Sequence, residues 1–135
     1  MVRIILNADD FGRDLNHNRA IDDSFKQGLI CSTGLIVTGK YLSNAVDLMI
    51  KGGYVEKVHL HFNLSTSLRD VNPEDIPLTE AMKNDSFFCK NGKFRPYRGL
   101  PINIRTIFKW KTVYQELVAQ YNKFKEVTGG KGNTS

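Results

Sequence analysis

The sequence predicts an α/β domain built from parallel βαβ units, and three observations support this prediction. Strand-like apolar segments alternate along the chain with amphipathic segments that have the spacing of helices. The order strand–helix–strand–helix–strand with short connections is typical of a parallel sheet with right-handed crossovers. The length of 135 residues, of which 41% are apolar and 24% charged, suits a single domain over residues 1–135 and excludes a disordered chain.

The first strand and the first helix are expected near the N-terminus. Residues 2–6 form a short, mostly apolar run that is typical of a buried parallel strand, and residues 7–12 follow its carboxyl end. A helix is expected to start at either Asn16 or Asn18, since asparagine is a favoured N-cap, and to stop at Gly28.

Two further strands and a helix complete the predicted βαβαβ unit. The second strand is expected over residues 29–37, and the second helix over residues 42–50, before a Gly-Gly pair. Residues 58–64 alternate in polarity, as in a strand with one face on the core. One face of that strand is expected to carry Val58, Leu60, Phe62 and Leu64, and the other His59, His61 and Asn63.

The segment after residue 65 is expected to be an excursion with a β-hairpin insertion, followed by a long helix. The pair Asn91-Gly92 within residues 87–94 is typical of a tight hairpin turn. Thr112 and Gln115 form a capping-box pair that predicts the start of the helix, and a Gly-Gly pair closes it. The apolar stripe of this helix consists of Val113, Leu117, Tyr121 and Phe124.

The positive charge of the chain is concentrated in one stretch. The formal net charge is +5 and the pI is about 9.3. Residues 86–115 contain seven basic residues, seven aromatic residues and no acidic residue. Such aromatic side chains either stack on bases or sugar rings, or pack inward beneath solvated Lys and Arg stems. A basic nucleic-acid-binding domain is therefore one alternative function, and the less favoured one.

Several classes of protein are excluded by cysteine spacing and hydropathy. Cys31 and Cys89 lie far apart and outside any CxxC spacing, which argues against a disulfide scaffold or a zinc ribbon. No apolar run approaches the ~18 residues of a membrane span. Met1 leads directly into a strand-like segment rather than a signal peptide. We therefore expect a cytoplasmic protein with no membrane partner.

Polar side chains gather where two predicted strands end. Asp9 and Asp10 follow the first strand, and His61 and Asn63 lie at the end of the third. Parallel sheets bind ligands at the carboxyl ends of their strands, and adjacent carboxylates repel unless a cation or a proton relieves them. Carboxylate oxygens and an imidazole nitrogen suit a divalent metal ion. The alternatives are a turn or helix-entry role for the aspartates and a structural, hydrogen-bonded role for the histidine.

Residues 5–12, with the sequence ILNADDFG, resemble the N-terminal signature of the YdjC-like (ChbG-type) carbohydrate deacetylases. The resemblance continues in order through residues 18–21, residues 28–33, residues 61–64, the hairpin at Asn91-Gly92 and residues 116–124. It implies a TIM-like, irregular (β/α) barrel. The 135 residues are about half of a barrel of ~250 residues, so we expect the N-terminal portion of such a barrel, in truncated form.

The resemblance also implies a metal-dependent hydrolase that removes N-acetyl groups from amino sugars or chitin-type oligosaccharides. Asp10 and His61 are then ligands of a divalent ion, Mg²⁺ or Zn²⁺, and Asp9 is the general base. The family's third metal-binding histidine belongs to a motif that this chain lacks. A non-catalytic metal- or sugar-binding remnant of the family is therefore an alternative.

Three residues are expected to contact the N-acetylated sugar or oligosaccharide. They are Asn63 at the strand end and Tyr97 and Trp110 in the basic, aromatic stretch. An incomplete barrel exposes strand edges and apolar faces. A homo-oligomer that pairs through such edges is therefore also expected.

Overall fold

The sheet at the centre of the fold has three parallel strands. The computed structural model describes residues 4–66, 75–96 and 109–133. In it β1 (Asn7–Phe11), β2 (Ser32–Leu35) and β3 (Val58–Leu60) lie in the order β1-β2-β3, and both neighbouring pairs are parallel. The predicted α/β class with a parallel sheet is thereby confirmed, whereas closure into a barrel stays a prediction.

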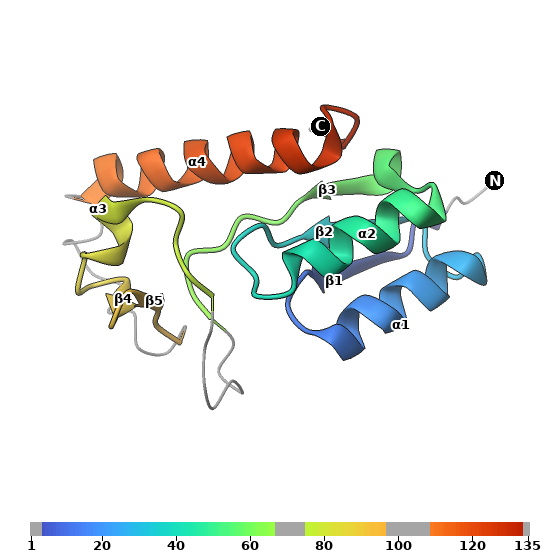
Figure 1. Cartoon of the computed structure of the whole chain (residues 1–135), viewed down its shortest axis with the longest axis horizontal. Helices are drawn as coiled ribbons and strands as arrows, with labels where there is room; N and C mark the ends of the chain where they lie inside the picture. The colour runs from blue at the N-terminus through green and yellow to red at the C-terminus, as the bar shows by residue number, and fades with distance from the viewer. Residues whose placement is uncertain (1–3, 67–74, 97–108, 134–135) are drawn as a thin grey trace.

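Helices connect the strands in the predicted order. α1 (Leu15–Lys26) links β1 to β2, and α2 (Leu42–Gly52) together with the short 3₁₀ turn η1 (Val55–Lys57) links β2 to β3. α1 and α2 lie next to each other, and α4 (Trp110–Thr128) runs along the β3 side of the sheet (Figure 1). Within the described ranges, no helix is long and apolar enough to cross a membrane.

The first strand does not lie where the apolar run predicts it. β1 begins at Asn7, and the side chains of Ile4, Ile5 and Leu6 are 75%, 72% and 55% exposed. The prediction of a buried strand over residues 2–6 is therefore wrong for the part that is described. Apolar composition indicates a strand, but it does not say which residues find a neighbouring strand to pair with.

α1 is capped by Asp14 rather than by Asn16 or Asn18, which both lie inside the helix. The Asp14 side chain accepts a hydrogen bond from the His17 N–H at 2.8 Å and so satisfies one of the free donors of the first turn. At the other end Gly28 has a left-handed φ of 69°, which confirms the predicted stop.

The second and third strands are shorter than the predicted ranges 29–37 and 58–64. After β3 the predicted alternation breaks, since Phe62 is 49% exposed and Asn63 is buried. The reason is that the chain leaves the sheet after His61, so a strand period no longer decides which side chains are buried.

The excursion contains the predicted hairpin. A short helix, α3 (Glu80–Lys83), precedes β4 (Cys89–Lys90), which pairs with β5 (Lys93–Phe94) in the antiparallel sense. Asn91 and Gly92 have φ values of 54° and 73°, as a two-residue turn with two left-handed positions requires.

α4 buries a partly polar face, which differs from the prediction. Its N-cap is Lys109, with no side-chain hydrogen bond, so the capping-box assignment of Thr112 and Gln115 is wrong. Of the predicted apolar stripe only Phe124 is buried. The buried positions of the helix are Glu116, Gln120, Phe124 and Thr128.

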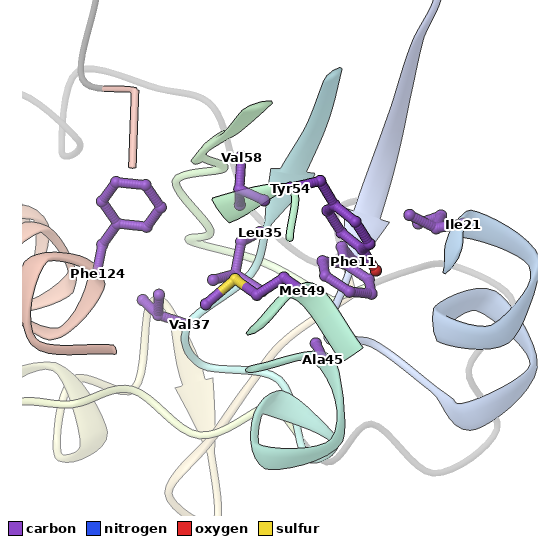
Figure 2. Packing of buried hydrophobic residues seen from close by; sticks show 9 residues of the cluster. All are labelled: Phe11, Ile21, Leu35, Val37, Ala45, Met49, Tyr54, Val58 and Phe124. Carbon is purple, nitrogen blue, oxygen red and sulfur yellow. The ribbon is translucent and has the colours of Figure 1, made fainter. Parts of the chain in front are cut away.

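The main hydrophobic core lies between the sheet and its helices. Figure 2 shows Phe124 of α4 and Val37 on one side of this core and Tyr54 beside Phe11 on the other. The remaining buried members are Ile21, Leu35, Ala45, Met49 and Val58. A second, smaller cluster of Met82, Phe88, Cys89 and Phe94 lies under the hairpin.

After α4 the chain returns to the outer edge of β3. Asn133 forms a parallel bridge with His59, and its N–H donates to the carbonyl oxygen of Val58 at 2.8 Å. α4 is therefore part of a third parallel crossover, which leaves the sheet at the end of β3 and returns at Asn133, beside β3.

Candidate active site

β1 contains a β-bulge at the two carboxylates singled out by the sequence. Its register against β2 includes one extra residue, so Asp9 and Asp10 together stand opposite the single residue Gly34. Asp10 has a φ of 66°, a left-handed conformation that aspartate adopts more readily than most residues. In a regular strand consecutive side chains point to opposite faces. The bulge is the local irregularity that frees the two aspartates from that rule.

His61, the first residue after β3, is the side chain that both carboxylates approach. The Oδ1 atoms of Asp9 and Asp10 lie 3.9 and 3.8 Å from His61 Nδ1. These separations exceed hydrogen-bond lengths. Side-chain exposure is 64% for Asp9 and 35% for both Asp10 and His61, so the group is open to solvent. The structure thus brings together the three residues that the sequence predicts as base and metal ligands.

Gly34 lies beside this group of side chains and leaves room for it. It lies on β2, between the strand that carries the aspartates and the strand that leads to the histidine. A Cβ atom at Gly34 would lie 3.1 Å from Asp9 Oδ1 and 3.2 Å from both Cβ and Nδ1 of His61. Sequence reasoning missed this residue, although a glycine inside a strand pattern is a recognised signal of close approach.

Arg13 is a second residue that sequence reasoning missed. Its Nη1 lies 3.0 Å from Asp10 Oδ2, its Nε donates to Asp14 Oδ2 at 3.2 Å, and its Nη2 is 3.2 Å from His17 Nδ1. Asp10 therefore presents one oxygen to Arg13 and the other to His61.

Asp14 anchors this arginine. Partial burial acts to raise the pKa of Asp14, but the hydrogen bond from the His17 N–H, together with the hydrogen bond and charge of Arg13, holds that pKa below its ordinary value. An ionised Asp14 thus serves as the helix cap of α1 and as a partner of the guanidinium.

Asn18 fixes the turn that follows the two aspartates. Its buried side chain accepts a hydrogen bond from Gly12 N–H at 2.7 Å and donates to the Tyr41 carbonyl oxygen and to Asn44 Oδ1 at 3.1 and 2.9 Å. Gly12 has a φ of 99°, which strongly favours glycine. Asn18, one of the residues that carry the family resemblance, therefore holds the end of β1 against the start of α2.

Gln120 fixes the chain that follows His61. Its side chain accepts from Asn63 N–H at 3.0 Å and donates to the Asn63 carbonyl oxygen at 2.8 Å. The Asn63 side chain in turn donates to Thr38 and Asp75 and accepts from Ser65 N–H. This buried, fully bonded position favours a structural role for Asn63 over the predicted substrate contact.

The other two residues predicted to contact substrate are Trp110 and Tyr97. Trp110 is the first residue of α4 and is 68% exposed. Tyr97 lies outside the described residues. For both, contact with a sugar stays a prediction.

The donor types at the site suit a divalent ion, and so do the pairwise distances. Two ligands that each lie about 2.1 Å from one ion are at most about 4.2 Å apart. The separations of 3.8 and 3.9 Å from His61 Nδ1 fall within that limit. As oriented, however, no three His, Cys, Asp or Glu side chains in the described ranges form a metal-holding group.

One cavity, of about 520 Å³, lies at the opposite end of the strands. It is lined by the carboxyl ends of α2 and α4 and by η1, among them Gly53, Val55 and Gly129. None of Asp9, Asp10 and His61 lines it. The chemistry-bearing side chains are thus gathered in an open group and not in this cavity.

Comparison with known proteins places this arrangement in a family. The profile of the YdjC-like protein family matches residues 3–131. The chain belongs to the YdjC-like family. Among its relatives, the carbohydrate deacetylase of Danio rerio is 30% identical over 129 residues, which are 95% of this chain and 38% of that protein. Carbohydrate deacetylase 2 of Listeria innocua serovar 6a is 33% identical over 127 residues, 93% of this chain and 45% of that protein.

A solved structure has the same fold as this YdjC-like chain. It is a candidate cellobiose-phosphate cleavage protein from Enterococcus faecalis V583, with a TM-score of 0.66 and 22% identity. The match covers 91% of this chain and 43% of the other. The chain thus spans less than half the length of the relatives it matches.

Proposed function

We propose that this YdjC-like protein is a metal-dependent hydrolase that removes N-acetyl groups from amino sugars or chitin-type oligosaccharides, in which Asp9, Asp10 and His61 bind the metal and accept the proton. The observation that carries the proposal is the convergence of Asp9, Asp10 and His61 over Gly34. This group of side chains lies at the carboxyl ends of parallel strands, where such sheets bind ligands. The relatives named carbohydrate deacetylase supply the reaction type and the carbohydrate class.

Asp10 and His61 are the proposed holders of a divalent ion, Mg²⁺ or Zn²⁺. Because Arg13 is bonded to Asp10 Oδ2, the oxygen that faces His61 is Oδ1. A side chain that hydrogen-bonds a metal ligand in this way fixes the orientation of that ligand and so contributes to metal affinity. When bound, the ion supplies positive charge that polarises an amide carbonyl and promotes the deprotonation of water.

Asp9 is the proposed general base. It is the more exposed of the two carboxylates and is held by a hydrogen bond from the Asn7 side-chain amide at 2.9 Å. It accepts a proton from water while the water oxygen adds to the acetyl carbonyl carbon. The proton then passes to the amide nitrogen, and cleavage of the C–N bond releases acetate and the free amino sugar. The exposed ring of Trp110, together with Tyr97, is proposed to contact the sugar.

Acetate release from N-acetylglucosamine oligomers tests the proposal. The purified chain is assayed with Mg²⁺, with Zn²⁺ and with EDTA, beside Asp9→Asn and a matched control, Asp23→Asn. Asp23 is a carboxylate on α1 with a 53% exposed side chain, so its loss removes the same charge outside the site. We expect metal-dependent release by the parent chain and by Asp23→Asn, and a loss of ~100-fold or more in Asp9→Asn.

Two other outcomes would replace the proposal. If the chain binds metal or sugar but releases no acetate under any condition, the non-catalytic remnant is the correct interpretation. If it instead binds nucleic acid with an affinity that falls steeply with salt, while sugars do not bind, the basic nucleic-acid-binding alternative is correct.

A further inference from the structure

We propose that Gly34 is the positioning residue of this site, because its missing side chain sets the distance between Asp9 and His61. The inference rests on the proposed function, in which Asp9 is the base and His61 a ligand. It goes further in assigning a role to a residue that touches neither substrate nor ion.

The spacing of the strands gives the first argument. Neighbouring strands lie about 4.8 Å apart, so β1 and β3, which flank β2, are about 9.6 Å apart. Asp9 Oδ1 and His61 Nδ1 are nevertheless only 3.9 Å apart. Both side chains therefore lean over β2 from opposite sides, into the space that a side chain on β2 would otherwise fill.

The second argument is that this space, and not the backbone conformation, is what favours glycine at position 34. Gly34 is absent from the glycines with positive φ, unlike Gly12, Gly28 and Gly53. Any residue can therefore adopt its backbone conformation, and alanine there reduces the conformational freedom of the unfolded chain. A Cβ atom would, however, lie 3.1 to 3.2 Å from the Asp9 oxygen and the His61 ring and Cβ, closer than ordinary van der Waals contact.

The two neighbours respond differently to such a Cβ. The Cβ of His61 is fixed by its own backbone, so that contact is relieved only by small shifts of the strand. Asp9 has a 64% exposed side chain that can rotate outward with the loss of one hydrogen bond, which the Asn7 amide donates to it. Gly34→Ala is therefore expected to displace the Asp9 carboxylate from its place beside His61, while Asp10, which Arg13 holds, stays in position.

The test compares Gly34→Ala with Gly28→Ala. Gly28 has open space around it but a φ of 69°, so alanine there strains the backbone at the end of α1, away from the site. We expect a crossed pattern. Gly34→Ala is expected to lower the melting temperature less than Gly28→Ala does, and to lower kcat for acetate release by ~100-fold with little change in KM, since a misplaced catalytic group costs about that much. Gly28→Ala lowers the melting temperature and leaves kcat unchanged.

A second readout does not depend on activity. The ¹H–¹³C ring signals of His61 in the metal-free chain, assigned by their loss in His61→Gln, are expected to shift in Gly34→Ala and not in Gly28→Ala. If the parent chain releases no acetate, the proposed function fails, and the His61 signals alone decide the role of Gly34. Unchanged His61 signals in Gly34→Ala would overturn the inference. So would a kcat loss that merely follows a loss of stability.

Discussion

The two hydrogen bonds between the Gln120 side chain and the Asn63 backbone give the most direct test of what fixes the chain after His61. Gln120 is fully buried on α4 and bonds both the N–H and the carbonyl oxygen of Asn63, at 3.0 and 2.8 Å. Its amide also donates to Glu116 Oε1 at 3.0 Å. Asn63 follows His61 by two residues, at the point where the chain has left the sheet. The glutamine therefore takes the place of a neighbouring strand.

Gln120→Met removes these hydrogen bonds, while the side chain keeps nearly the same length and the residue nearly the same helix propensity. It leaves two buried backbone groups of Asn63 without partners, at about 1–3 kcal/mol each. The expected loss in the free energy of unfolding is therefore about 4 kcal/mol. At about 2.1 cal/mol/K per residue, a chain of 135 residues loses roughly 3.5 °C in melting temperature per kcal/mol, which gives a decrease of about 14 °C.

Urea unfolding followed by circular dichroism measures the first quantity, and amide hydrogen exchange at Asn63 tests the mechanism. Exchange of the Asn63 N–H is expected to accelerate in Gln120→Met. Gln115→Met is the matched control, because Gln115 is exposed on the same helix and its replacement is expected to cost less than ~0.5 kcal/mol. A loss below about 1 kcal/mol in Gln120→Met, or unchanged exchange at Asn63, would refute the reasoning.

Three further predictions concern other parts of the chain. Asp14→Ala is expected to cost about 1 kcal/mol at pH 7. Because the folded-state pKa of Asp14 is lowered from 3.8, the stability it contributes is present above that pH and is lost as the pH falls through the lowered value. Urea unfolding of the parent chain and of Asp14→Ala at a series of pH values from 7 downward would show this loss. Burial, with the nearby carboxylates of Glu116 and Asp85, raises the pKa of Cys89 to about 11, so at pH 8 a thiol reagent is expected to modify exposed Cys31 and to spare Cys89 unless the chain is unfolded. The exposed apolar residues 4–6 beside an edge strand predict concentration-dependent self-association, and a monodisperse monomer by light scattering would contradict it.

The sequence predicts the order of elements well, because that order depends on local patterns. The alternation of strands and helices, the Gly28 stop and the Asn91-Gly92 turn each follow from a few neighbouring residues, and the structure confirms them. The family that residues 5–12 resemble is likewise confirmed, and the roles of Asp9 and Asp10 that the resemblance implies stay predictions.

The position of β1 depends on pairing, and composition does not reveal it. The most apolar residues, Ile4 and Ile5, are exposed, whereas the polar segment Asn7–Phe11 pairs with β2. The bulge at Asp9 and Asp10 is equally hidden, because a register shift is a relation between two strands.

The buried face of α4 is a second feature that composition does not reveal, because several of its residues are polar. An apolar stripe predicts that Tyr121 is buried, yet Tyr121 is 39% exposed while Glu116 and Gln120 are fully buried. Glu116 accepts from the backbone N–H groups of Leu78 and Thr79, both at 2.9 Å. These polar residues are buried because irregular segments beside the helix have backbone groups that must be bonded. Which segments those are is decided by the tertiary fold.

The site residues meet only where the sheet departs from regularity, and this explains why its supports are polar. Regular parallel strands would point Asp9 and Asp10 to opposite faces and would keep β1 and β3 side chains apart. The bulge, the missing side chain at Gly34 and the early departure of the chain after His61 each remove one of these obstacles. Where the chain leaves the sheet, its backbone N–H and C=O groups no longer have partners in a neighbouring strand. Buried side-chain amides bond these groups instead: Asn18 bonds Gly12 after β1, and Gln120 bonds Asn63 after β3. A change in either amide should therefore alter the geometry of the site without touching any residue in it.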